Sequence, residues 1–212
     1  PGPASEPARV APAVDPPAWL VLVAPVVAAA IVHGNALGGF FASDDLDFLA
    51  RARGLDPTPW GWSRPLPGRF RWELFTAWFG VQPFPHLLLA WLLHVASALL
   101  VARITIVAGL GRWTALTAGV LVAGSSIAYT STHWASGLGE VMAAAFALAA
   151  LALHLECRRH RRPILAWLAG ACAVCAVFSK ESVLLLPLAV FAFDRLVPVR
   201  GEGRGALREI AW

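Results

Sequence analysis

The chain has 212 residues, of which 58% are hydrophobic and 14% are charged. A soluble globular domain has about a quarter of its residues charged, so this composition excludes an ordinary soluble domain and indicates a membrane protein. The formal net charge of +4 falls in short segments between apolar runs. Charge in such segments sets membrane topology, and it forms no patch that predicts a nucleic-acid partner.

The N-terminal part predicts a tail followed by a first membrane span. Residues 1–17 are rich in proline and alanine, which predicts a disordered cytoplasmic tail. An uninterrupted apolar run, Ala18–Val32, continues weakly to Phe41. A cleaved signal peptide is the alternative interpretation of this run. We favour a retained span, because a membrane crossing needs about 20 residues and the segment to Phe41 supplies them.

Residues 38–85 are the one long polar and aromatic segment, and we interpret them as a functional outer loop. Two short helices are predicted within it. One begins at the acidic cluster of residues 44–47. The other covers Arg69–Phe79, whose polar side chains, Thr76 among them, fall on the face opposite to its apolar side chains. This pattern predicts an amphipathic helix that lies on the membrane surface.

Five further apolar segments predict membrane-spanning helices, since lipid offers backbone groups no hydrogen-bond partners outside the helix. They are Leu87–Leu110, Trp113–Tyr129, Val141–Leu155, Pro163–Phe178 and Val183–Val197. We therefore expect an all-α integral membrane protein with about six transmembrane helices and two juxtamembrane amphipathic helices in the first outer loop. The membrane domain covers residues 18–198. We expect residues 199–212 to form a cytoplasmic segment of an incomplete chain.

The placement of arginines predicts the topology. The turn Cys157–Arg162 is the most basic short loop, and short basic loops stay in the cytoplasm. By alternation of spans, the N-terminus is then cytoplasmic. The long loop and the polar turns at residues 132–140 and 179–182 lie on the extracytoplasmic, or periplasmic, side. Polar groups from distant parts of the sequence converge there, which predicts a site on that face.

Asp44 and Asp45 are the first candidate site residues. Asp44 followed by Asp47 fits a helix start, with Asp44 as the N-cap whose carboxylate accepts free backbone amides. The functional alternative is a general base, because a carboxylate near apolar walls has its pKa raised by desolvation. The sequence leaves both interpretations open.

Each of the other charged candidates also has two interpretations. Arg64 binds lipid headgroups or clamps a phosphate, which a guanidinium matches in a forked geometry. Glu140 favours a helix N-terminus or marks a site at the membrane edge. Lys180 and Glu181 form an ordinary surface pair or supply a cation for a lipid-linked phosphate.

Several nucleotide and metal signatures are absent from the sequence. It has no P-loop, no dinucleotide-binding glycine fingerprint and no His-Glu metalloprotease motif. Nucleotide-driven chemistry is therefore not indicated, which favours a donor carried on a membrane lipid.

The order of these motifs resembles the GT-C-type glycosyltransferases that use polyprenyl-phosphate sugars. The chain looks similar to their branch of protein O-mannosyltransferase-like membrane proteins, some of which carry tetratricopeptide repeats. The likeness covers Phe40 to about Val197. It consists of the Asp44-Asp45 pair, Arg64-Pro65-Leu66 in the outer loop, the turn from His133 to Glu140, and Ser179-Lys180-Glu181.

The resemblance implies inverting transfer of a sugar from a lipid phosphate to an acceptor hydroxyl, on a protein, glycan or lipid, at the outer face. It implies that Asp44 is the general base and that Asp45 orients the acceptor or binds a divalent metal, a cofactor that we leave open. Arg64 and Lys180 are expected to neutralise the leaving phosphate. The residues expected to orient sugar or phosphate are His133, Glu140 and Glu181. The alternative functions are a transporter or flippase of lipid-linked sugars and a membrane scaffold.

Overall fold

The computed structural model describes residues 15–61 and 64–196, and over these residues the predicted all-α class is confirmed. The α-helices are α1 (Ala18–His33), α2 (Asp44–Ala52), α3 (Arg71–Phe79), α4 (Phe84–Val107), α5 (Arg112–Ala123), α6 (Tyr129–His133), α7 (Leu138–His160), α8 (Pro163–Ser179) and α9 (Leu186–Leu196). The short helical turns are η1 (Gly34–Gly38), η2 (Leu66–Phe70), η3 (Ser126–Ala128), η4 (Ala135–Gly137) and η5 (Glu181–Leu185). Most of the predicted tail, residues 1–14, and the segment 199–212 lie outside the described residues.

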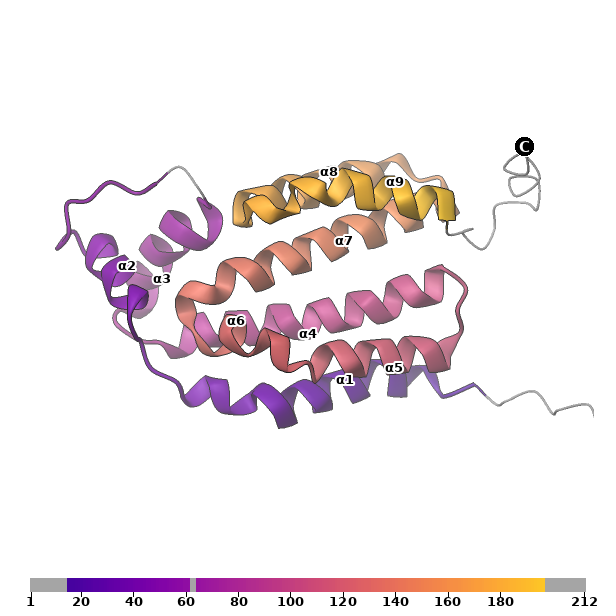
Figure 1. Cartoon of the computed structure of the whole chain (residues 1–212), viewed down its shortest axis with the longest axis horizontal. Helices are drawn as coiled ribbons and strands as arrows, with labels where there is room; N and C mark the ends of the chain where they lie inside the picture. The colour runs from indigo at the N-terminus through magenta and orange to yellow at the C-terminus, as the bar shows by residue number, and fades with distance from the viewer. Residues whose placement is uncertain (1–14, 62–63, 197–212) are drawn as a thin grey trace, which may run out of the picture.

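The long helices run along one axis in alternating directions (Figure 1). α2 and α3 lie together across one end of this bundle, which we call the α2–α3 end. α1 begins and α9 ends at the opposite end, where the α4–α5 and α7–α8 turns also lie. Short connections between long helices produce this antiparallel arrangement. The polar turns that precede α7 and η5 therefore lie at the α2–α3 end.

In the part of the chain that the structure describes, three helical segments are long and apolar enough to cross a membrane: Ala18–Gly38, Phe84–Val107 and Ala135–His160. They match three of the predicted spans in place and type, since a crossing needs about 20 predominantly apolar residues. α8 is also apolar but shorter, with 17 residues.

Two other predicted spans differ from the structure. The segment Trp113–Tyr129 is not one helix, because α5 ends at Ala123 and η3 follows. Gly124 and the two serines after it explain the break: glycine disfavours helix, and serine side chains compete for backbone hydrogen bonds. The predicted span Val183–Val197 starts within the 3₁₀ turn η5 and becomes α-helical at Leu186.

α1, α4 and α5 pack closely because small residues lie at their contacts. Ala98 of α4 and Ala123 of α5 are fully buried. A Cβ atom at Gly119 of α5 would lie 2.9 Å from Cγ of Pro25 in α1 and 3.3 Å from Cβ of Ala102 in α4. Backbones that approach this closely gain van der Waals contact, which is a main source of attraction between helices in lipid.

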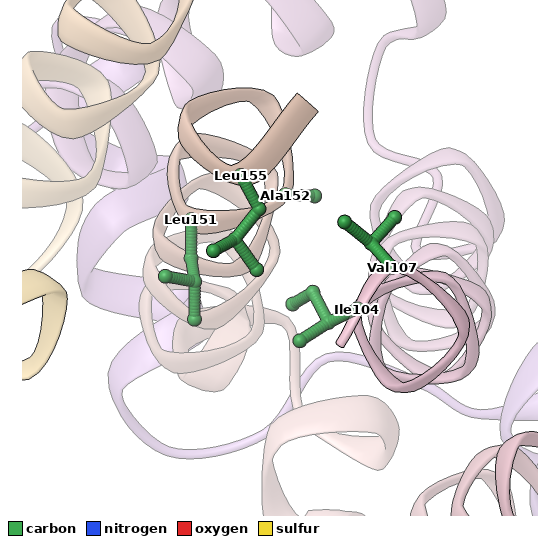
Figure 2. Close-up of a cluster of buried hydrophobic side chains, with 5 residues drawn as sticks. All are labelled: Ile104, Val107, Leu151, Ala152 and Leu155. Atoms are coloured by element: carbon green, nitrogen blue, oxygen red, sulfur yellow. The ribbon is translucent and has the colours of Figure 1, made fainter. Parts of the chain in front are cut away.

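α4 and α7 share a core of aliphatic side chains toward their C-terminal ends, away from α2 and α3. Ile104 and Val107 of α4 face Leu151, Ala152 and Leu155 of α7 (Figure 2). Val107 and Leu155 are fully buried. This contact fixes α7 relative to α4, and with it the polar turn at which α7 begins.

The two short helices predicted in residues 38–85 are confirmed as α2 and α3. The start of α2 differs from expectation. Ser43 occupies the N-cap and Asp44 is the first helical residue, so the interpretation of Asp44 as the N-cap is wrong. The acidic cluster nevertheless fills the first turn, where the helix dipole favours negative charge.

α3 buries a different face from the one that its pattern predicts. Thr76, expected on the exposed polar face, is buried together with Arg71 and Trp72. Trp72 forms a core with Leu49 of α2 and Ala135 of η4. Arg71 tolerates burial because its guanidinium bonds a backbone carbonyl and a histidine ring nitrogen. These contacts tie α2, α3 and the turn before α7 into one unit.

Candidate functional site

A cavity of about 370 Å³ lies at the α2–α3 end of the bundle. Its walls come from α2, the segment that leads into α3, the turn that begins α7, and η5. The charged residues that line it are Arg51, Arg64, Arg69, Glu140 and Glu181. Ligand pockets in proteins have volumes of about 300–1,000 Å³, so this charged cavity can hold a small polar ligand.

Arg64 and Glu181 bridge two walls of the charged cavity, although they lie 117 positions apart in the sequence. Arg64 Nε donates to Glu181 Oε2 at 2.9 Å, and Nη2 donates to the other carboxylate oxygen in a forked arrangement. The Arg64 hydrogen bond lowers the pKa of Glu181 to about 2, and the same contact raises the pKa of Arg64 above its ordinary value. The two side chains are 46% and 60% exposed, so solvent screens the pair and a ligand can reach it.

Lys180 and Glu140 form a second ion pair at the same place. The Lys180 ammonium donates to Glu140 Oε1, and the hydroxyl of Ser131 donates to Oε2 at 3.2 Å. Lys180 thus pairs with Glu140 of α7 and not with its neighbour Glu181, so the interpretation of these two residues as an ordinary surface pair is wrong. The structure therefore brings together four predicted site residues: Arg64, Glu140, Lys180 and Glu181.

Every arginine that lines the charged cavity already has a carboxylate partner. The pairs are Arg51–Asp56, Arg64–Glu181 and Arg69–Glu73, with Lys180–Glu140 beside them. The cavity wall is therefore close to electrically neutral. An anion that binds these cations must exchange with a carboxylate that accepts the same donors.

Glu140 also borders a second, apolar cavity of about 500 Å³ between α4, α5 and α7. Its lining is largely aliphatic, as at Val141 and Leu148, and includes His94. Nε2 of His94 donates to the carbonyl oxygen of Ala123 at 3.0 Å and so links α4 to α5. Glu140 thus lies where a polar and an apolar cavity meet.

Asp45 is fully buried and holds the turn that begins α7. Its carboxylate accepts the backbone N–H of Ser136 at 2.6 Å and that of Ala42 at 3.2 Å. Burial raises the pKa of Asp45, while these N–H groups and the charge of Arg71 act in the opposite direction. Because Ser136 lines the charged cavity, Asp45 acts on that cavity through the backbone of its wall.

Arg71, which is only 3% exposed, holds another wall of the same cavity. Its Nε donates to the carbonyl oxygen of Pro67 at 2.8 Å, and its Nη1 donates to Nδ1 of His86 at 2.8 Å. Burial lowers the pKa of Arg71 to about 9, with Asp45 opposing the shift, so the guanidinium is charged at neutral pH. Pro67 lines the cavity. Sequence reasoning missed Arg71, because nothing local distinguishes it from the other arginines of the loop.

Asp44 and Asp47 are exposed at the start of α2. The Asp44 carboxylate accepts the hydroxyl of Ser43 at 2.9 Å. Neither carboxylate is among the described residues that line the charged cavity. Asp44 does lie at the same end of the bundle, one residue before Asp45, whose carboxylate binds the cavity wall.

His133 belongs to a separate cluster that joins the end of α6 to the end of α1. Its Nε2 lies 2.9 Å from Oδ1 of Asn35, and its ring stacks on Tyr129 with the centroids 3.9 Å apart. The ring of His33 packs against it at 5.7 Å. His133 is not one of the described residues that line the charged cavity, so the structure does not bring it to the predicted phosphate site.

Two aromatic residues that the sequence did not single out, Phe48 and Trp60, also line the charged cavity. Their rings are stacked, with centroids 6.0 Å apart and planes 5° from parallel. The guanidinium carbon of Arg51 lies 5.9 Å from the centroid of Phe48. The sequence did contain a clue to Trp60. This residue lies in a stretch broken by prolines, where no amphipathic helix would place its side chain in the core.

Within residues 15–61 and 64–196 there is no group of three or more His, Cys, Asp or Glu side chains arranged to hold a metal ion. Asp45, which the resemblance links to a divalent metal, does not fit that role. Its carboxylate is fully buried and already accepts two backbone N–H groups.

The sequence matches no protein-family model, no curated protein and no solved structure. Over residues 15–61 and 64–196 the chain is all-helical, with three helices able to cross a membrane and a charged cavity at one end of the bundle.

Proposed function

We propose that the chain is a membrane glycosyltransferase of the GT-C type, which moves a sugar from a polyprenyl phosphate to an acceptor hydroxyl. The observation that carries the proposal is that Arg64 lines the charged cavity and Lys180 is paired with Glu140 of the same cavity wall, beside helices that can cross a membrane. A lipid phosphate needs cations for its headgroup and apolar surface for its tail. The apolar cavity that shares Glu140 offers such a surface.

In the proposed reaction, the acceptor oxygen attacks the anomeric carbon from the side opposite to the phosphate. The bond from that carbon to the phosphate oxygen breaks, and its electron pair stays on the lipid phosphate, whose negative charge increases. A carboxylate takes the acceptor proton, and the configuration at the anomeric carbon inverts. Arg64 and Lys180 stabilise the growing charge more strongly in the transition state than in the bound donor, which lowers the barrier.

Two carboxylates are candidates for the base that takes the acceptor proton. Asp44 is the base that we propose, because the resemblance implies it, and its exposed carboxylate lies outside the lining of the charged cavity. Glu140 is the second candidate, because it lines the charged cavity and is freed from Lys180 when a phosphate binds that cation. Replacing each carboxylate with its neutral amide, in Asp44→Asn and in Glu140→Gln, shows which of the two residues is the base.

Transfer from a labelled polyprenyl-phosphate sugar by the full-length, reconstituted protein tests the proposal. Arg64→Met and Lys180→Met should each lower transfer roughly 100-fold, because each removes a donor to the developing phosphate charge. Asp44→Asn should abolish transfer and leave donor binding near normal. Asp47→Asn is its matched control, since this carboxylate is exposed in the same helical turn.

The outcomes separate the function from the assignment of the base. Full activity of Asp44→Asn together with loss of activity in Glu140→Gln moves the base to Glu140. Failure of the wild-type protein to use any polyprenyl-phosphate sugar contradicts the proposed function. Full activity of the Arg64→Met, Lys180→Met double variant contradicts the proposed site.

We further propose that α1, α4, α7 and α8 cross the membrane, together with the continuous segments from α5 to α6 and from η5 to α9, with the α2–α3 end on the extracytoplasmic side. The basic turn between α7 and α8 lies at the opposite end of the bundle, and short basic loops favour the cytoplasm. A membrane-impermeant maleimide tests this orientation. It should label Asp47→Cys in intact cells and label Arg159→Cys only after permeabilisation.

A transporter or flippase of lipid-linked sugars is the second candidate. The apolar cavity favours it, because two of its lining residues, Leu121 and Ile127, are 68% and 90% exposed and leave it open at the side of the bundle. Such a protein moves the lipid without breaking a bond. Movement of a labelled lipid-linked sugar between vesicle leaflets, with its sugar–phosphate bond intact, would identify this function.

A further inference from the structure

Three aromatic rings form a continuous stack from the protein core to the charged cavity. Trp72 is fully buried, and Phe48 stacks on it with centroids 5.7 Å apart and planes 21° from parallel. Trp60 stacks in turn on Phe48. Aromatic pairs with centroids about 4.5–7 Å apart attract each other, so the Trp60 indole is held in place by the core. The last two rings of the stack line the cavity.

Trp60 differs from a tryptophan that serves only as an interfacial anchor. Trp78 of α3 is 70% exposed, as expected for a side chain at the membrane surface. Trp60 is only partly exposed, packs against the core of Leu49, Trp72 and Ala135, and lines the charged cavity. A ring held in this way forms a flat, rigid part of the cavity wall.

The polar groups near this aromatic wall include both donors and acceptors. Arg51 and Arg64 only donate hydrogen bonds, whereas ionised Glu140 and Glu181 only accept them. A phosphate uses only the donors of this set. A sugar uses both kinds of group for its hydroxyls, and its ring C–H bonds pack against the electron-rich face of an aromatic side chain.

We propose that Phe48 and Trp60 form a sugar-binding subsite, on which a pyranose ring stacks while neighbouring charged side chains bond its hydroxyls. This inference rests on the proposed function, because it assigns the aromatic side of the cavity to the sugar and the side of Arg64 and Lys180 to the phosphate. The ring belongs to the donor sugar or to a sugar of the acceptor. The recognition chemistry is the same in both cases, and the experiment distinguishes them.

Two lipids that differ only in the sugar test the subsite. The full-length protein in lipid nanodiscs is titrated with a polyprenyl phosphate and with the same lipid carrying a hexose. Trp60→Ala should weaken binding of the hexosyl lipid roughly 3- to 10-fold and leave binding of the bare phosphate unchanged. Trp60→Phe, which keeps a ring, should retain most of the affinity. Trp78→Ala is the matched control and should change neither affinity.

The ratio of the two affinities does not depend on the fraction of folded protein, so a variant that folds poorly still gives an answer. If Trp60→Ala leaves this ratio unchanged but raises KM for a glycan acceptor without changing kcat, the subsite holds the acceptor sugar. An unchanged ratio with an unchanged acceptor KM overturns the subsite, while wild-type transfer preserves the proposed function. Wild-type protein that binds neither lipid overturns both.

Discussion

Asp45 offers the most direct test of how the charged cavity is held together. Replacing it with alanine removes the acceptor of two backbone N–H groups, those of Ser136 and Ala42, and the counter-charge of buried Arg71. A buried N–H left without an acceptor costs about 1–3 kcal/mol, and two such groups lose theirs here. Removing a carboxylate whose burial raises its pKa offsets part of this cost.

We expect a net destabilisation of about 3 kcal/mol in Asp45→Ala from the two lost acceptors. In a chain of this size, that change lowers the thermal midpoint by roughly 6–12 °C, measured in detergent by the loss of the monodisperse size-exclusion peak on heating. Asp45→Asn keeps one acceptor oxygen and should fall between this variant and the wild type. Asp47→Ala, in the same turn but exposed, is the control and should stay within about 2 °C of the wild type.

Hydrogen exchange locates the effect of Asp45→Ala in the chain. Amides in η4, at residues 135–137, should exchange faster than in the wild type, because their tether to α2 is gone. Amides in the middle of α4 should keep their protection. A thermal midpoint equal to that of the wild type, or a loss of protection spread evenly over the bundle, would refute the conclusion that Asp45 acts through Ser136.

Two further predictions concern charge and packing. The Arg64 contact lowers the pKa of Glu181 from 4.5 to about 2, so the stabilising effect of the pair is fully present above pH 4.5 and is lost as the pH falls toward 2. The difference in thermal midpoint between the wild type and Glu181→Gln should disappear over that range, and a difference that persists at the acidic limit would contradict the pairing. A Cβ at Gly139 would lie 3.2 Å from Cγ of Pro67, whereas one at Gly170 would meet no atom within 4 Å. Gly139→Val should therefore destabilise the protein by about 1–3 kcal/mol in thermal unfolding and Gly170→Val should not, and equal effects of the two would show that the contact with Pro67 is not tight.

The long helices could be predicted because hydrophobic length is a local property of the sequence. α1, α4 and α7 each follow from one apolar run that is long enough to cross a membrane. The break after Ala123 was missed, because apolar character continues as far as Ile127 while the backbone preferences of Gly124 and the serines oppose helix. Hydropathy alone does not carry that second signal.

The site could be predicted only in part, because the contacts between its charges depend on the fold. Alternation of the predicted spans puts Arg64, Glu140, Lys180 and Glu181 on one face, and the structure brings them together. Which cation meets which carboxylate depends on the directions of neighbouring side chains. Two adjacent residues, Lys180 and Glu181, pair with different elements. The role of Asp45 was also hidden, because its partners are backbone amides, which leave no pattern in the sequence.

The pairing of these cations has a consequence for product release in the proposed reaction. The spent lipid phosphate would compete with a resident carboxylate for each contact, since Arg64 can return to Glu181 and Lys180 to Glu140 as the product departs. Such an arrangement favours rapid turnover over tight retention. The arrangement also selects ligands by charge. A ligand that is less anionic than the carboxylate it displaces gains no binding free energy from the exchange.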